Sequence, residues 1–182
     1  AALVIGLALA ELSARVFSAE GLAAPRCTGE VLREAADPRR GWELAPGSVM
    51  EIAFAQRDGS TRVVEHRVGP HGWRGAPFEA RPAPETVRIG CVGDSNVFGW
   101  GVEEGEAWPA RLGVELRAAG HRVETLNLGV PNIDVEQKVA LAEQAAFELD
   151  CGLVLFALHF DDFALEGAPV RELGEGAAWL AR

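Results

Sequence analysis

The chain has 182 residues, of which 27 are acidic and 17 basic, so its formal net charge is −10 at pH 7. A nucleic-acid surface needs clustered positive charge, and this balance therefore predicts no nucleic-acid partner. The length is sufficient for one domain with a hydrophobic core and an appendage. Three cysteines, at positions 27, 91 and 151, form neither a disulfide framework nor a metal-ligand spacing. We interpret Cys91 and Cys151 as small buried apolar residues.

Residues 1–10 are almost entirely apolar, and a helical pattern with charges continues to Phe17. Ten apolar residues are half of the ~20 that a helix needs to span a bilayer. We interpret residues 1–18 as the end of a transmembrane or anchor helix, which predicts a membrane-anchored, extracytoplasmic domain, periplasmic or at the cell surface. A signal-peptide core and an ordinary buried helix are the alternatives.

Residues 19–84 are interpreted as a connector with a β-hairpin. Residues 24–47 are rich in Pro, Arg and Gly and are expected to be irregular, with Trp42 as a packing anchor. Two strand-like runs, at 49–55 and 61–68, flank an Asp58-Gly59 pair. An Asp-Gly pair between apolar strands is a strong signal for a hairpin turn.

Strand and helix patterns alternate after residue 85. The expected strands are 87–92, 122–128 and 153–160, and the expected helices are 107–119 and 134–149. Such alternation predicts a parallel sheet of the α/β class. The last strand is almost wholly apolar, as is typical of a central strand buried on both faces. In the second helix, Asp134 and Gln137 predict a capping box, and a buried face is expected at Val135, Val139, Ala142, Ala146 and Leu149.

Each expected strand is followed by a turn with polar residues or glycine. The three turns are Gly93-Asp94-Ser95-Asn96, Asn127 to Asn132 with Gly129 inside it, and His159-Phe160-Asp161-Asp162. Because the carboxyl ends of parallel strands meet at one edge of a sheet, we expect all three turns at one crevice. A serine beside a glycine at such an edge is well placed to be a nucleophile. The alternatives are that Ser95 caps the turn or the following helix, and that Gly129 is a plain turn glycine.

These three blocks resemble the SGNH (GDSL-type) hydrolases, a family of serine esterases and acyl-group transferases, over about residues 87–165. The detailed sequence is similar to a membrane-anchored bacterial branch of that family. The resemblance implies a three-layer, flavodoxin-like parallel sheet, here partial, preceded by an N-terminal helix and a small β-hairpin segment. It assigns residues 85–182 to the N-terminal part of an SGNH-hydrolase-like α/β domain.

The resemblance implies a role for each block. Ser95 Oγ attacks an ester carbonyl, and the backbone N–H groups of Ser95 and Gly129 stabilise the oxyanion together with a side chain of the third block. That side chain is Asp161 here, where the family has Asn, and an ionised carboxylate donates no hydrogen bond. The Asp-x-x-His block that supplies the family's base is missing, so we interpret the sequence as a fragment. His159 is the one internal candidate for the base.

The sequence thus predicts a serine esterase that needs no cofactor and acts on a small-molecule or glycan ester, such as an O-acyl group of a glycan. One alternative is an O-acyltransferase that uses the same serine, and another is a catalytically degenerate domain that binds acyl groups or glycans. A third assigns Asp94, Asp161 and Asp162 to a Mg²⁺ pocket. We favour a simpler role for Asp94 and Asp162, as hydrogen-bond acceptors for the backbone of their loops.

Overall fold

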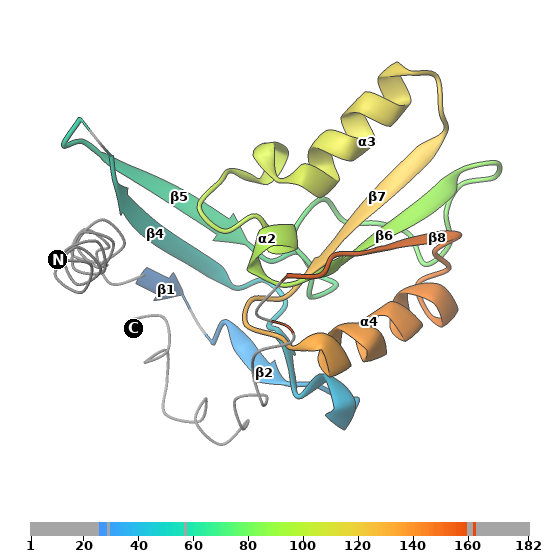
Figure 1. Ribbon diagram of the computed structural model, residues 1–182, viewed down its shortest axis with the longest axis horizontal. Helices are drawn as coiled ribbons and strands as arrows, with labels where there is room; N and C mark the ends of the chain where they lie inside the picture. The colour runs from blue at the N-terminus through green and yellow to red at the C-terminus, as the bar shows by residue number, and fades with distance from the viewer. Residues whose placement is uncertain (1–25, 29, 57, 160–161, 163–182) are drawn as a thin grey trace, which may run out of the picture.

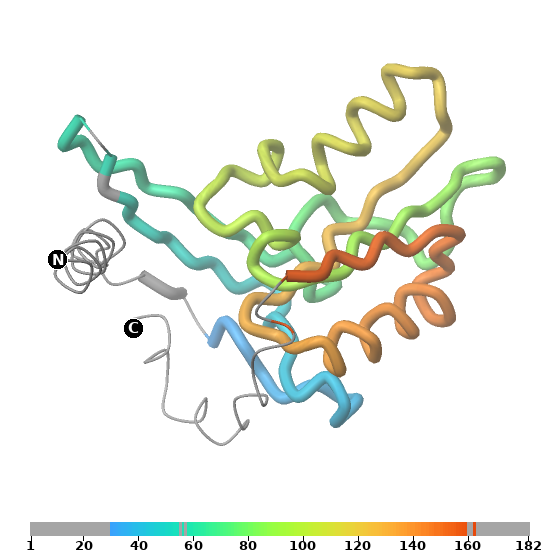
Figure 2. Tube along the Cα trace, viewed as in Figure 1, coloured from blue at the N-terminus to red at the C-terminus, as the bar shows by residue number. Residues whose placement is uncertain are grey.

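The computed structural model describes residues 26–28, 30–56, 58–159 and 162 (Figures 1 and 2). The helix expected over residues 1–18 lies outside the described residues. Within the described ranges, no helix is long and apolar enough to cross a membrane.

A three-stranded parallel sheet organises the second half of the chain. Its strands are β6 (Val87–Gly93), β7 (Val123–Gly129) and β8 (Leu153–Phe156), in the order β7-β6-β8. Helix α3 (Trp108–Ala118) lies on one face and α4 (Val135–Phe147) on the other (Figure 1). The predicted α/β class with a parallel sheet is confirmed.

Side chains of β6 alternate between the two faces of the sheet, as the pleat of a strand requires. Ile89 and Cys91 belong to the apolar cluster that includes Leu112 and Leu116 of α3. Val92 belongs instead to the larger cluster that includes residues of α4. Both faces of this central strand are therefore covered, which explains its continuous apolar sequence.

Strand β8 differs from its prediction. It ends at Phe156 rather than at residue 160, and within the described part of the chain it pairs only with β6. Leu153 is 46% exposed. The expectation of a central strand buried on both faces is wrong for the described sheet, because an apolar sequence reports burial preference and not the position of a strand in the sheet.

The predicted capping box at the start of α4 is confirmed, but of the predicted buried face only Ala142 and Leu149 pack against the core, as partly buried residues. The Asp134 carboxylate accepts a hydrogen bond from the Gln137 backbone N–H at 2.9 Å, and the Gln137 side chain accepts one from the Asp134 backbone N–H at 2.9 Å. Val139 is 47% exposed. The buried residues of α4 are Gln137, Lys138, Ala140, Leu141 and Ala145.

The first half of the described chain is antiparallel. Strands β1 (Arg26–Thr28), β4 (Val49–Ala55) and β5 (Thr61–Arg67) form a sheet in the order β1-β4-β5. Strands β2 (Leu32–Glu34) and β3 (Trp42–Leu44) pair around the short 3-10 helix η1 (Pro38–Arg40). The described residues of the stretch at 24–47 are therefore not irregular as predicted, because pairing with other segments of the chain, and not local propensity, forms the short strands.

One hydrophobic core joins the antiparallel strands to the parallel sheet. Trp42 and Met50 are 5% and 2% exposed, and they pack in the same cluster as Phe98 and Leu128. The prediction of Trp42 as a packing anchor is confirmed. The antiparallel strands thus pack around the carboxyl end of β6, where the short helix α2 (Ser95–Phe98) begins.

The shared core predicts a large cost for removing a central side chain. Leu128 is fully buried, so Leu128→Ala should lower the free energy of unfolding by about 2–5 kcal/mol. Val114 is 52% exposed, and Val114→Ala should change the free energy of unfolding by less than about 0.5 kcal/mol. Urea unfolding measures both, and equal losses would contradict this description of the core.

Candidate functional site

Ser95 is the first residue of α2 and follows the carboxyl end of β6 by two positions. The helix is capped by Asp94, whose Oδ1 accepts hydrogen bonds from the Asn96 backbone N–H at 2.8 Å and from the Asn96 side-chain amide at 3.0 Å. The capping alternative for Ser95 is therefore wrong. Ser95 is half-buried, and the described residues place no hydrogen-bond partner on its hydroxyl.

The turn with Ser95 and the turn with Gly129 lie side by side. Gly93 and Gly129 are register partners at the ends of β6 and β7. The Val130 backbone N–H donates to the Gly93 carbonyl oxygen at 3.0 Å. Asp161 lies outside the described residues. The structure thus brings Ser95 and Gly129 to one edge of the sheet and leaves the place of Asp161 open.

Gly129 contacts the backbone of α2. A Cβ built at Gly129 would lie 2.1 Å from the Phe98 backbone nitrogen, so no larger residue fits without a shift of the helix. Its N–H donates to Asn127 Oδ1 at 3.0 Å, and Asn127 Nδ2 donates to the Phe98 carbonyl oxygen at 3.2 Å. The packing of α2 against β7 therefore explains the glycine without a substrate, and its N–H is engaged in this conformation.

The third turn is joined to the first by Lys138, the only lysine of the chain. Lys138 Nζ donates to Asp94 Oδ2 at 2.9 Å and to both carboxylate oxygens of Asp162, at 2.5 and 2.6 Å. Asp162 Oδ2 also accepts the His159 backbone N–H at 2.8 Å. The favoured role of Asp94 and Asp162 as acceptors for loop backbone is confirmed, and an ion cluster that the sequence analysis missed is added to it.

The ion cluster also bears on the Mg²⁺ pocket for its two described carboxylates, Asp94 and Asp162. The ammonium group of Lys138 occupies the position between Asp94 and Asp162 that a cation would take, and the described residues contain no group of three metal ligands. Burial raises the pKa of Asp94, but hydrogen bonds from the Asn96 backbone and from Lys138 outweigh it, so the pKa is lowered from its usual value. Asp94 is therefore ionised at neutral pH.

The other end of α2 is held by Arg74, which is 2% exposed. Its Nη1 donates to the carbonyl oxygens of Phe98 and Gly99 at 2.8 and 2.6 Å, and its Nη2 donates to the Val102 carbonyl oxygen at 2.6 Å. The guanidinium carbon lies 5.1 Å from the centre of the Phe98 ring. Arg74 thus satisfies carbonyl groups that a helix end leaves without partners.

His66 of β5 lies beneath the same end of α2. Its ring stacks on Phe98 with centroids 5.4 Å apart, and its Nε2 accepts the Gly101 N–H at 3.1 Å. Burial and, secondly, the charge of Arg74 lower the pKa of His66 from 6.5 to about 4. The imidazole is 1% exposed, and the lone pair of its Nε2 is already engaged. His66 therefore supports the loop after α2 and is not positioned as a base for Ser95.

None of the four histidines makes a hydrogen bond to Ser95 among the described residues. His71 packs its ring on Phe78, with centroids 4.7 Å apart, and His121 is exposed at the amino side of β7. His159 is half-buried at the end of the third strand segment. Its candidacy as the base stays a prediction.

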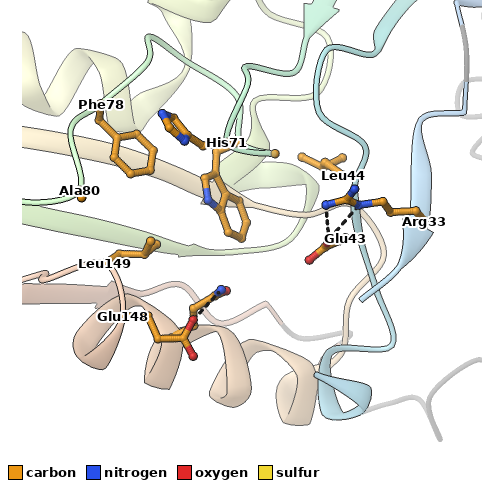
Figure 3. Close-up of a pocket in the computed structure, with 11 residues that line it drawn as sticks. Arg33, Glu43, Leu44, His71, Phe78, Ala80, Glu148 and Leu149 are labelled. Carbon is orange, nitrogen blue, oxygen red and sulfur yellow. Dashed lines mark hydrogen bonds and ion pairs between the residues drawn. The ribbon is translucent and has the colours of Figure 1, made fainter. Parts of the chain in front are cut away.

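A cavity of about 340 Å³ lies away from these turns, between β2–β3, the segment after β5 and the end of α4 (Figure 3). Trp73, Phe78 and Leu149 form its apolar wall. Its charged and amide side chains are paired with each other, as in the ion pair of Arg33 with Glu43. Ser95 does not line this cavity.

The comparisons with known proteins are sparse. No family model and no curated protein matches the chain. Among solved structures, the chain is similar to one described as "Crystal structure of AlinE4, a SGNH-hydrolase family esterase", with 29% sequence identity and a TM-score of 0.37. The match covers 50% of this chain and 50% of that one, so the chain spans about half the length of that esterase. The TM-score is too low for this likeness to decide the fold or the function.

The packing of Gly129 predicts a stability loss that does not depend on catalysis. Gly129→Ala should lower the free energy of unfolding by about 1–3 kcal/mol, because the added Cβ overlaps the α2 backbone. Gly105 is the matched control, since a Cβ there meets nothing within 4 Å. Urea unfolding of Gly129→Ala and Gly105→Ala compares the two, and equal stability would show that α2 does not pack on β7 as described.

The lowered pKa of His66 predicts a specific pH dependence of stability. Between the unfolded value of 6.5 and the folded value of about 4, the unfolded chain binds a proton that the folded chain does not. The free energy of unfolding should therefore fall as the pH drops from about 6.5 towards about 4. In His66→Gln this part of the fall should disappear, whereas the exposed His121→Gln should keep it. Urea unfolding across this pH range tests the difference, and identical pH slopes in both variants would refute it.

Proposed function

We propose that this chain carries the nucleophile of an SGNH-type serine hydrolase that acts on an ester, and that Ser95 is this nucleophile. The observation that carries the proposal is the position of Ser95. Ser95 is half-buried, and its hydroxyl has no hydrogen-bond partner among the described residues, whereas its neighbours Asp94 and Asn96 are hydrogen-bonded to each other. A small hydroxyl residue held at the carboxyl edge of a parallel sheet meets the requirement for acyl transfer.

The reaction would follow the chemistry of an activated serine. Ser95 Oγ attacks the ester carbonyl, a base takes its proton, and the alcohol leaves with that proton to give an acyl-enzyme that water then cleaves. The Ser95 backbone N–H is the first oxyanion donor. Gly129 serves as the second only when the Asn127 side chain releases its N–H, because the two are hydrogen-bonded at 3.0 Å.

The substrate class and the location belong to the same proposal. We infer an ester of a small molecule or a glycan, including O-acyl groups, from the resemblance of the three strand-end turns to the SGNH hydrolases. The apolar run at residues 1–10 supports a membrane-tethered, extracytoplasmic protein. The acyltransferase alternative differs only in the acceptor, a sugar hydroxyl in place of water.

Three observations favour a second candidate, a domain that binds acyl groups or glycans without cleaving them. The N–H of Gly129 is engaged by Asn127, and Asp161 stands where the family has a donor. No histidine among the described residues is hydrogen-bonded to Ser95. Loss of one oxyanion donor costs about 10²–10³ in kcat, so these features weaken catalysis together.

Ester hydrolysis by the intact protein tests the nucleophile. Ser95→Ala should lower the turnover of p-nitrophenyl acetate at least a hundredfold, on the order expected for loss of a nucleophile. Ser60→Ala, in the exposed turn between β4 and β5, is the control and should leave the rate unchanged.

Equal rates for Ser95→Ala and the unchanged protein would overturn the proposal. A second variant, Asp161→Asn, separates the hydrolase from the binding domain, because it restores the side-chain donor that the SGNH family has at this position. A gain in turnover favours the hydrolase, whereas no gain and no labelling by a fluorophosphonate favour the binding domain.

A further inference from the structure

The Lys138 cluster is buried next to the proposed nucleophile. The side chains of Lys138, Asp162 and Asp94 are 0%, 3% and 15% exposed. Asp94 directly precedes Ser95 in the chain, so one carboxylate of the cluster belongs to the residue next to the proposed nucleophile. With one ammonium and two carboxylates, the formal charge of the trio is −1.

Lys138 is not itself a base in this arrangement. An ammonium group has three hydrogens, and Lys138 Nζ has three carboxylate contacts, one with Asp94 and two with Asp162. All three donors are therefore used in contacts with carboxylate oxygens. A mechanism in which neutral Lys138 takes the proton of Ser95 does not fit these contacts.

The positive charge of the Lys138 ammonium group instead offsets the negative charges of the Asp94 and Asp162 carboxylates. Acyl transfer builds negative charge on the nucleophile and on the oxyanion, and buried carboxylates nearby disfavour that charge. We propose that Lys138 is a positioning residue that neutralises Asp94 and Asp162 beside Ser95 and so allows negative charge to develop there. This inference rests on the proposed role of Ser95 as the nucleophile.

The proposal predicts that reactivity at position 95 follows the charge of the trio. Asp162→Asn changes the formal charge from −1 to 0, and Lys138→Met changes it to −2. The double variant Lys138→Met/Asp162→Asn returns it to −1. Negative charge at position 95 should therefore form most easily in Asp162→Asn, equally in the unchanged trio and the double variant, and least easily in Lys138→Met.

A cysteine at position 95 measures this order without any ester hydrolysis. In a Ser95→Cys/Cys27→Ser background, iodoacetamide alkylates the thiolate at position 95. Burial raises the pKa of the two remaining thiols, Cys91 and Cys151, to about 12 and about 11, so they should not react in the folded protein. A tenfold change in thiolate fraction changes the alkylation rate about threefold, because nucleophilicity falls as the pKa falls.

We expect alkylation to be about threefold faster in Asp162→Asn and about threefold slower in Lys138→Met than in the background, with the double variant within about twofold of it. Glu143→Gln, which removes an exposed carboxylate on the same helix, is the control and should have no effect. Near-UV circular dichroism identifies the folded variants. If Lys138→Met does not fold, Asp162→Asn against the background decides alone.

An alkylation rate in Asp162→Asn that equals the background rate would overturn the role of Lys138. The experiments distinguish failure of the proposed role of Lys138 from failure of the proposed role of Ser95 as the nucleophile. If the charge order holds but Ser95→Ala hydrolyses esters normally, the proposed function is wrong and the electrostatic influence of Lys138 on position 95 is retained.

Discussion

The ammonium group of Lys138, held between Asp94 and Asp162, is the contact on which the arrangement of the strand-end turns depends. One side chain of α4 joins the turn after β6 to the turn after β8. Removal of the lysine would leave two buried carboxylates without a counter-ion, and an uncompensated buried charge is strongly destabilising. Arg74 has the matching role at the other end of α2, where it binds three carbonyl oxygens. A four-residue helix is not stable by itself, so these two buried cations fix the turn that carries Ser95.

The same tight packing restricts the site. Gly129 approaches the α2 backbone closely, and its N–H donates to the Asn127 side chain. Asn127 in turn binds the carbonyl of Phe98, so the second strand is tied to the nucleophile helix through one side-chain amide. A hydrolase needs that amide to release Gly129, whereas a binding domain does not. The mobility of Asn127 is therefore one of the points on which the two proposed functions differ, beside Asp161 and the base for Ser95.

The sequence predicted those features that local pattern determines. Strand–helix alternation, the Asp134 capping box and the placement of Ser95 and Gly129 at one edge follow from periodicity and turn composition. The buried face of α4 does not follow from the periodicity of its sequence. Apolar residues such as Val139 are exposed on this helix, whereas Gln137 and Lys138 are buried. Gln137 donates to the Arg40 carbonyl oxygen at 3.0 Å, and Lys138 binds two carboxylates, so distant partners make their burial favourable. The short strands before residue 47 were missed for the same reason. The signal that was available for the ion cluster is the single lysine of the chain, Lys138, in a helix rich in apolar residues.

The Nζ resonance of the single lysine tests the central claim, the buried ion cluster, most directly. In protein labelled with ¹⁵N at lysine Nζ, an ammonium that donates all three hydrogens to buried carboxylates exchanges slowly with water. The structure predicts one ¹H–¹⁵N cross-peak for Lys138 that is visible at neutral pH and lost in Asp162→Asn/Asp94→Asn. A Lys138 signal that is already averaged with water in the unchanged, folded protein would show an exposed amine, and it would contradict the account.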